Sequence, residues 1–345
     1  MLKTELSNRK KAVLSAIVKA YIETGEPIGS KILMGLLENA PSSATLRNEM
    51  NELCSLGFLS QPHTSAGRVP TSSAYKLYID SLMQPSELND AQKLYIDRFF
   101  TANGIAFEAM PQAAADLLNE LTGFPSFALF SADQNLSFKQ IRLINTGKHS
   151  AALLLVTSDG RTLSAMCRIS NTLTADSIER FEKIVKDKLL RKPLFEFSKA
   201  HLQNIVMSLC VDDFILMPLL TELFKMAEQS VCPKTFLSGT SRLYSFTSAD
   251  EARKIASLMS NSELFLAALK KDEQDGVIFG SDTAFLELSD KAIVLTDYEC
   301  RHSKCGKIGI IAPSRMSYDS IIPSIKYVAD TLTALMTETV KDMED

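Results

Sequence analysis

The sequence predicts an α+β protein with more than one domain. Segments with helical apolar spacing fill the first 84 residues, and strand-like runs follow near residues 126–160 and again near 275–314. Segments with helical spacing separate the two sets of strands. At 345 residues the chain exceeds a usual single core, so we expect two or three domains.

Composition and charge restrict the class of protein. Hydrophobic residues make up 46% of the chain and charged residues 23%, which is typical of soluble globular proteins. No apolar run reaches the roughly 18 to 20 residues that a membrane span needs, and the N-terminal segment lacks an apolar signal. We therefore expect a soluble, cytoplasmic protein with no membrane partner. The first 84 residues carry nine basic and seven acidic side chains, a net charge of +2. The net charge of the whole chain is -4, so the remaining residues carry -6. This asymmetry favours an N-terminal module that faces phosphates.

Six cysteines are scattered without the dense spacing of a disulfide scaffold, so reduced thiols are expected. Only Cys300, His302 and Cys305 lie close enough together to suggest a metal site. That segment lacks a fourth ligand and the usual zinc-site spacing. We expect no metal and no cofactor.

Residues 7–57 predict three helices. Ser7 can cap the first helix and Gly25 can end it. The second helix, within residues 28–37, is short, and four of its apolar residues can share one face: Ile28, Ile32, Leu33 and Leu36. Ser42 can cap the third helix, which should end at Gly57.

The third helix separates an apolar side from a small, amide-rich side. Leu46, Met50 and Leu53 lie on the first side. The opposite side and its flanks carry Ala44, Thr45, Arg47, Asn48, Asn51 and Ser55. Arg and Asn side chains can form bidentate contacts with guanine and adenine edges, so this side is a candidate for base recognition. For this helix alone, an ordinary solvated face is an equally good interpretation.

Residues 58–71, FLSQPHTSAGRVPT, predict a short β-hairpin. Pro62 and Pro70 suit the ends of edge strands, and Gly67 allows a tight turn. Three short helices followed by such a hairpin predict a winged helix-turn-helix, and four hairpin residues then face DNA phosphates: His63, Thr64, Ser65 and Arg68. Without the helices, an ordinary surface hairpin would explain the segment equally well.

The segments YIETGEPIGSK and ATLRNEMNELCSLGFLSQPHTSAGRVPTSSAYKLYIDSLM resemble the N-terminal domain of the heat-inducible transcription repressor HrcA family. Residues 306–336 resemble the closing segment of that family, whereas residues between about 160 and 300 resemble it only loosely. Ser43 and Ser317 depart from the proline and aspartate that are usual there, but serine is tolerated at both places.

The resemblance implies a dimeric repressor that binds the CIRCE inverted repeat upstream of chaperone operons and is kept active by the GroEL chaperonin. By position, the recognition helix would contain Ser42, Ala44, Thr45, Arg47, Asn48 and Asn51. The wing would contain His63, Thr64, Ser65, Gly67 and Arg68. The physics of DNA binding also favours a dimer, because one small module binds weakly and reads a short half-site.

The resemblance further implies a GAF-like α/β body interrupted by a mostly helical dimerisation insert. We place the DNA-binding domain at residues 1–84, and the helical connector with the first part of the GAF-like domain at 85–156. The inserted dimerisation domain occupies 157–240, and the second part of the GAF-like domain with the C-terminal helix occupies 241–345. From the residues alone only an α+β body follows, and the apolar stripe of the insert helices fits a core or a dimer seam equally.

Two other classes of function stay open beside the repressor. Nucleotide-binding loops and the G-x-S-x-G nucleophile motif are absent from the sequence, so we do not expect an enzyme. A ligand-responsive winged-helix regulator with a small-molecule-sensing body is the main alternative. A scaffold that uses the winged helix for protein contact is the third.

Overall fold

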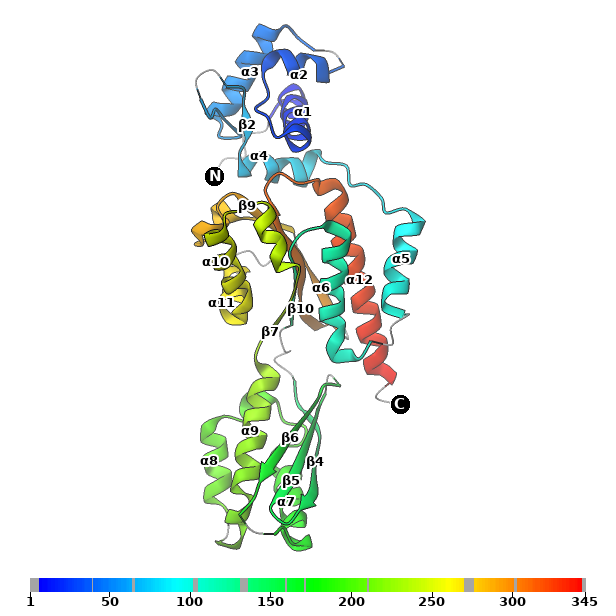
Figure 1. Ribbon diagram of the computed structural model, residues 1–345, viewed down its shortest axis with the longest axis vertical. Helices are drawn as coiled ribbons and strands as arrows, with labels where there is room; N and C mark the ends of the chain where they lie inside the picture. Colours follow the sequence, from blue (N-terminus) through cyan, green and yellow to red (C-terminus); the bar gives the residue numbers. More distant parts are fainter. Residues whose placement is uncertain are drawn as a thin grey trace.

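The computed structural model describes residues 6–38, 40–63, 66–101, 105–130, 136–158, 160–170, 172–209, 211–269, 276–300 and 303–342. The molecule is elongated, and its three parts follow one another along the long axis (Figure 1). A small helical domain with a two-stranded hairpin lies at one end, a body with a central sheet lies in the middle, and an inserted domain lies at the other end.

The N-terminal domain is a winged helix-turn-helix. Its elements are α1 (Asn8–Thr24), α2 (Ser30–Leu36), α3 (Ser43–Ser55), β1 (Leu59–Ser60), β2 (Val69–Pro70) and α4 (Ser72–Leu77). The predicted caps are confirmed: the Ser7 hydroxyl accepts from the Lys10 amide, and Gly25 ends α1 with a left-handed φ of 73°. The Ser42 hydroxyl accepts from the Thr45 amide at the start of α3.

The predicted core face of α2 is wrong in part. Ile28 and Leu33 are buried, but Ile32 and Leu36 are 57% and 50% exposed. Ile28 precedes the helix and forms a β-bridge with Arg68, so the spacing of residues 28, 32 and 36 does not describe one helical face. A helix of two turns then leaves Leu33 as the apolar residue that reaches the core.

The body is built on a five-stranded sheet of order β7-β3-β10-β9-β8, in which every neighbouring pair is antiparallel. Its strands are β3 (Ser126–Phe130), β7 (Lys234–Ser238), β8 (Gly276–Phe279), β9 (Lys291–Cys300) and β10 (Ser303–Pro313). Side chains alternate between two cores, because Ala128 and Phe130 face one side and Phe127 and Leu129 face the other.

Helices cover both faces of this sheet (Figure 1). One face packs against α5 (Asp90–Thr101), α6 (Met110–Thr122) and α12 (Tyr318–Asp342), and the other packs against α10 (Ala249–Ser260) and α11 (Ser262–Leu269). The predicted antiparallel sheet interrupted by an insertion is therefore confirmed.

Short helical turns complete the described elements: η1 (Tyr78–Leu82), η2 (Phe107–Ala109), η3 (Leu194–Glu196), η4 (Val211–Leu216), η5 (Thr240–Ser245), η6 (Gly280–Asp282) and η7 (Leu286–Leu288).

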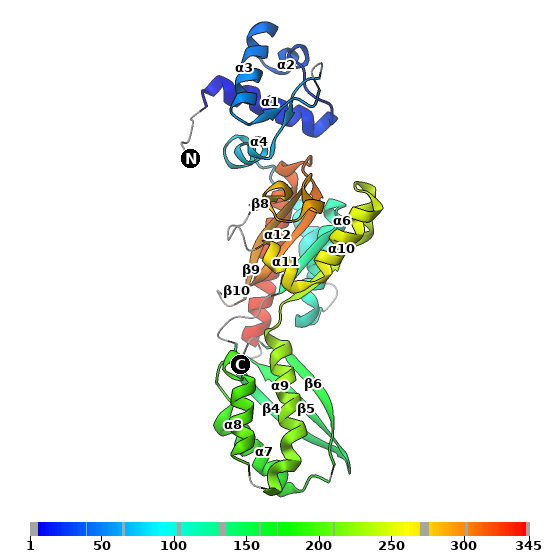
Figure 2. The ribbon, with the colours of Figure 1, turned by 90° about the vertical axis from the view of Figure 1, so that its left-hand side faces the viewer.

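The insert lies between β3 and β7 and has its own core. A three-stranded antiparallel sheet of order β4-β5-β6 packs against helices on one side (Figure 2). Its elements are β4 (Phe138–Gly147), β5 (Ser150–Thr157), β6 (Thr162–Arg168), α7 (Ala175–Lys188), α8 (Lys199–Met207) and α9 (Met217–Val231).

The prediction that the strand-like runs up to residue 156 belong to the body is wrong, because β4 and β5 pair with β6 in a separate sheet. The expected boundary at 156/157 falls inside β5, one residue before its end. Apolar alternation shows that a segment is a strand, but it does not show which sheet the strand joins. The insert has two layers, one of helices and one of the three strands β4, β5 and β6.

Within the described residues, no helix is long and apolar enough to cross a membrane. Among the cysteines that the structure describes, Cys54, Cys167 and Cys232 are free thiols. No group of three or more His, Cys, Asp or Glu residues is placed to hold a metal ion in the described part of the chain. His302, the middle member of the candidate cluster at residues 300–305, lies outside the described residues.

Candidate nucleic-acid interface

Helix α3 presents the polar side that its sequence predicts. Ala44, Arg47, Asn48 and Asn51 are exposed, while Leu46, Met50 and Leu53 are buried in the core of the domain. The hydroxyl groups of Ser42 and Thr45 are engaged at the start of the helix: their oxygens lie 3.0 Å apart, and the Ser42 oxygen also accepts from the Thr45 amide. The residues free to meet base edges along this side are therefore Arg47 and Asn48.

The acidic side chains of α3 are held by cations of α1. Arg9 pairs with Glu49, and the Lys10 ammonium lies 2.7 Å from a Glu52 carboxylate oxygen. The hydrogen bond from Lys10, together with its charge, lowers the pKa of Glu52, so this carboxylate is ionised and compensated at neutral pH. The pairing reduces the repulsion that these carboxylates would exert on DNA phosphates.

The wing is joined to the recognition helix by a contact between two predicted site residues. The Arg68 guanidinium donates through Nη2 to the Asn51 side-chain oxygen at 2.7 Å. The wing strands pair Leu59 with Pro70 and Ser60 with Val69. His63 is exposed near the tip, whereas Thr64 and Ser65 lie outside the described residues.

Gly67 has a different role from the tight turn that the sequence suggested. A Cβ atom at this position would lie 2.5 Å from the carbonyl carbon and oxygen of Ile28. The adjacent Arg68 amide donates to the Ile28 carbonyl, and the Ile28 amide donates to the Arg68 carbonyl, both at 2.9 Å. Glycine is needed because the wing passes directly against the segment that connects α1 to α2.

These elements surround a hollow of about 480 Å³ between the start of α2, the helix α3 and the wing. Arg47, Asn51 and Arg68 line it together with Gly29, Ser30, Met50, Gln61, Ala66 and Gly67. Gln61 and Ser30 were not among the predicted site residues. Gln61 donates to the Ala66 carbonyl at 3.1 Å across the wing, and the Ser30 hydroxyl lies 2.9 Å from that of Ser43. The Ser30 contact joins α2 to α3 across 13 residues of chain, which no local motif indicates.

Replacing Gly67 by alanine is expected to displace the wing. The added methyl group meets backbone atoms of Ile28 that cannot rotate away, so we expect a loss of about 1–3 kcal/mol in the free energy of unfolding. DNA affinity should fall about tenfold as wing contacts to phosphate are lost.

Gly35→Ala is the matched control, because a Cβ there meets nothing within 4 Å and alanine favours a helix. Thermal unfolding and DNA titration of both variants check the prediction. Equal behaviour of the two variants would show that the wing does not need this close approach.

Comparisons with known proteins agree on one family. Residues 5–82 match the model of the winged helix-turn-helix transcription repressor, HrcA DNA-binding, and residues 108–322 match that of the HrcA protein C terminal domain. A protein of Acholeplasma laidlawii (strain PG-8A) named heat-inducible transcription repressor HrcA is 31% identical over 353 residues, covering 98% of this chain and 99% of its own.

A protein of the same name from Acetivibrio thermocellus is 28% identical over 330 residues, covering 94% of each chain. A crystal structure described as that of a hypothetical protein aligns with a TM-score of 0.64 at 22% identity, covering 97% of this chain and 100% of its own. That likeness concerns the fold.

Proposed function

Because the chain belongs to the HrcA family of heat-inducible transcription repressors, we propose that it binds the CIRCE inverted repeat as a homodimer and represses chaperone operons in the cytoplasm. The observation that carries the proposal is the exposed side of α3 beside the wing. Arg47 and Asn48 are exposed there, and Arg68 lies next to them. The two acidic side chains of α3 are paired with cations of α1. Arg47 and Asn48 would contact bases in the major groove, and Arg68 with His63 would contact the adjacent backbone.

The outer face of the insert sheet supports the proposed homodimer. Strand pairing places Ile144, Ala152 and Met166 in one row across β4, β5 and β6, on the face opposite the insert core. Ile144 and Met166 are 52% and 66% exposed. An apolar row that stays exposed among the described residues suits an isologous contact, in which the same patch of two copies meets.

The resemblance to the family also leads us to propose that the GroEL chaperonin maintains the active repressor. In this scheme the repressor competes with unfolded proteins for chaperonin, so repression weakens when misfolded proteins accumulate. The proposal requires that operator-binding activity recover with chaperonin after mild heating. A repressor that recovers fully by itself would contradict it.

Fluorescence anisotropy of an inverted-repeat CIRCE duplex and a scrambled duplex of equal length tests the proposed function. The titration is made at several salt concentrations, with and without GroEL chaperonin. We expect tight, salt-sensitive binding to the CIRCE duplex at two chains per duplex, and weak binding to the scrambled one. Equal weak binding to both, with no rescue by chaperonin, would exclude this operator and favour a ligand-responsive regulator.

A further inference from the structure

The winged-helix domain is joined to the body by an aromatic contact and not by a linker alone. Tyr75 of α4 packs against both Phe279, at the end of β8, and Tyr318, at the start of α12, and these two rings also contact each other. Its ring centroid is 5.8 Å from that of Phe279, at an interplanar angle of 21°, and 5.7 Å from that of Tyr318. All three side chains are at most 3% exposed, so the contact closes a continuous core between the two domains.

Polar contacts surround this aromatic cluster of Tyr75, Phe279 and Tyr318. The hydroxyl groups of Ser72 and Ser281 lie 2.8 Å apart, and the Lys76 ammonium lies 2.6 Å from an Asp282 carboxylate oxygen. At the end of α1, Gly25 packs against the guanidinium of Arg315 from the body. A Cβ at Gly25 would come within 2.6 Å of Arg315 Nη1. The DNA-binding domain is therefore held at two places, α4 and the end of α1.

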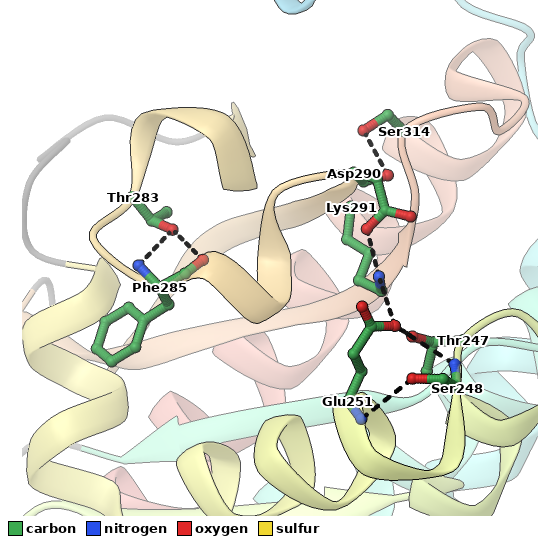
Figure 3. Close-up of polar contacts among 8 residues, drawn as sticks. All are labelled: Thr247, Ser248, Glu251, Thr283, Phe285, Asp290, Lys291 and Ser314. Atoms are coloured by element: carbon green, nitrogen blue, oxygen red, sulfur yellow. Dashed lines mark hydrogen bonds and ion pairs between the residues drawn. The ribbon is translucent and has the colours of Figure 1, made fainter.

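The segment of the body that carries Tyr318 and Arg315 is itself anchored (Figure 3). The Ser314 amide and hydroxyl both donate to the Asp290 carbonyl, at 3.2 and 3.0 Å, and Tyr318 donates from its hydroxyl to the Ser314 carbonyl at 2.7 Å. The Asp290 carboxylate pairs with the ammonium of Lys291, which is only 1% exposed and lies 4.0 Å from a Glu251 carboxylate oxygen.

The turn that carries Ser281 and Asp282 is anchored in a similar way. The Thr283 hydroxyl donates to the Gly280 carbonyl at 2.8 Å. It also accepts from the Phe285 amide at 3.3 Å (Figure 3). A Cβ at Gly280 would lie 1.5 Å from the Leu288 carbonyl oxygen, so the turn packs tightly on the chain that follows it. The segment that carries Tyr318 is thus tied to the start of β9 and, through Lys291, to α10, and the turn that carries Ser281 is held against the chain that follows it.

We propose that Tyr75, Phe279 and Tyr318 are positioning residues that determine which half-site separation the repressor accepts. The proposal rests on the proposed binding of a dimer to an inverted repeat. A flexible tether between the DNA-binding domain and the body would let two modules reach half-sites at many separations. A rigid joint, that is, a buried contact between the DNA-binding domain and the body, fixes the separation of the two recognition helices in the dimer. DNA with the wrong spacing is then bound through one module only.

The test compares Tyr75→Ala with Tyr75→Phe. Alanine removes the ring that contacts both Phe279 and Tyr318, whereas phenylalanine keeps the ring and removes a buried hydroxyl that has no hydrogen-bond partner among the described residues. Affinity is measured for operator duplexes with the natural half-site spacing, for duplexes with two or five base pairs inserted, and for a duplex with one half-site.

For the wild type and Tyr75→Phe, we expect the insertions to weaken binding by about tenfold or more. For Tyr75→Ala, the affinity ratio between natural and altered spacing should fall to about twofold, with half-site affinity unchanged. A folded Tyr75→Ala protein that keeps the wild-type ratio, or binds the natural spacing more tightly, would overturn the proposal. The exposed double variant Lys76→Ala/Asp282→Ala loosens the joint without a cavity and should shift the ratio in the same direction.

Hydrogen exchange measured without DNA separates this proposal from the proposed function. In the wild type we expect protected amides in residues 72–82, and in Tyr75→Ala we expect these amides alone in the domain to lose protection. Rapid exchange of the wild-type segment would overturn the rigid joint whatever DNA the protein binds. A wild type that is protected there but does not distinguish operator from scrambled DNA would contradict the proposed function and leave the joint intact.

Discussion

Replacing Arg47 by alanine is expected to remove most of the preference for operator over scrambled DNA while leaving binding to scrambled DNA close to that of the wild type. Arg47 is exposed on the side of α3 opposite its buried leucines, where its guanidinium can form two hydrogen bonds with a guanine edge. Such a contact contributes about 1–3 kcal/mol of discrimination, or about 5- to 150-fold, and a dimer makes it twice. Anisotropy titrations with both duplexes give the ratio directly.

Arg68→Ala is the control for this prediction, because it removes a cation of the wing and should affect all duplexes alike. Phosphate contacts carry no sequence information, so the preference for operator should persist. The slope of log affinity against log salt should decrease by about 0.9 for each lost phosphate contact, or about 2 for a dimer. If both variants lost only nonspecific affinity, α3 would not be the recognition helix.

The winged helix could be predicted from sequence because its signals are local. Ser7 and Ser42 cap the helices at the residues expected, and Gly25 ends α1. The outward position of Arg47 and Asn48 follows from helical periodicity alone. What failed within this domain is the face of α2, where Ile28 belongs to a bridge with Arg68 instead of to the helix.

The contacts that position the site depend on residues far apart in the chain, and sequence patterns do not contain them. Asn51 and Arg68 are both in the predicted set, but their hydrogen bond shows that Asn51 supports the wing in the free protein. Gly67 was expected in the wing for its turn, yet it is needed for the approach to Ile28. The assignment of β4 and β5 to the insert is likewise a choice between sheets that alternation leaves open.

Met166→Arg is expected to convert the proposed dimer into monomers and to weaken operator binding by about 100-fold or more. Met166 is exposed at the end of the apolar row that begins at Ile144, so an arginine there places a charge in the contact without disturbing the insert core. Without the dimer, the second half-site is no longer bound at the high effective concentration of a linked module. Affinity for a single half-site should stay unchanged.

The matched control is Met207→Arg, which makes the same substitution in the same domain at a residue that is 83% exposed. Met207 ends α8, which lies on the opposite side of the insert from β6 (Figure 2). Analytical ultracentrifugation and operator titration of both variants distinguish the two surfaces. Dissociation of Met166→Arg alone would place the contact on the sheet face. Dissociation of Met207→Arg alone would place it on the helical side, and a stable dimer in both would remove the insert from the proposed interface.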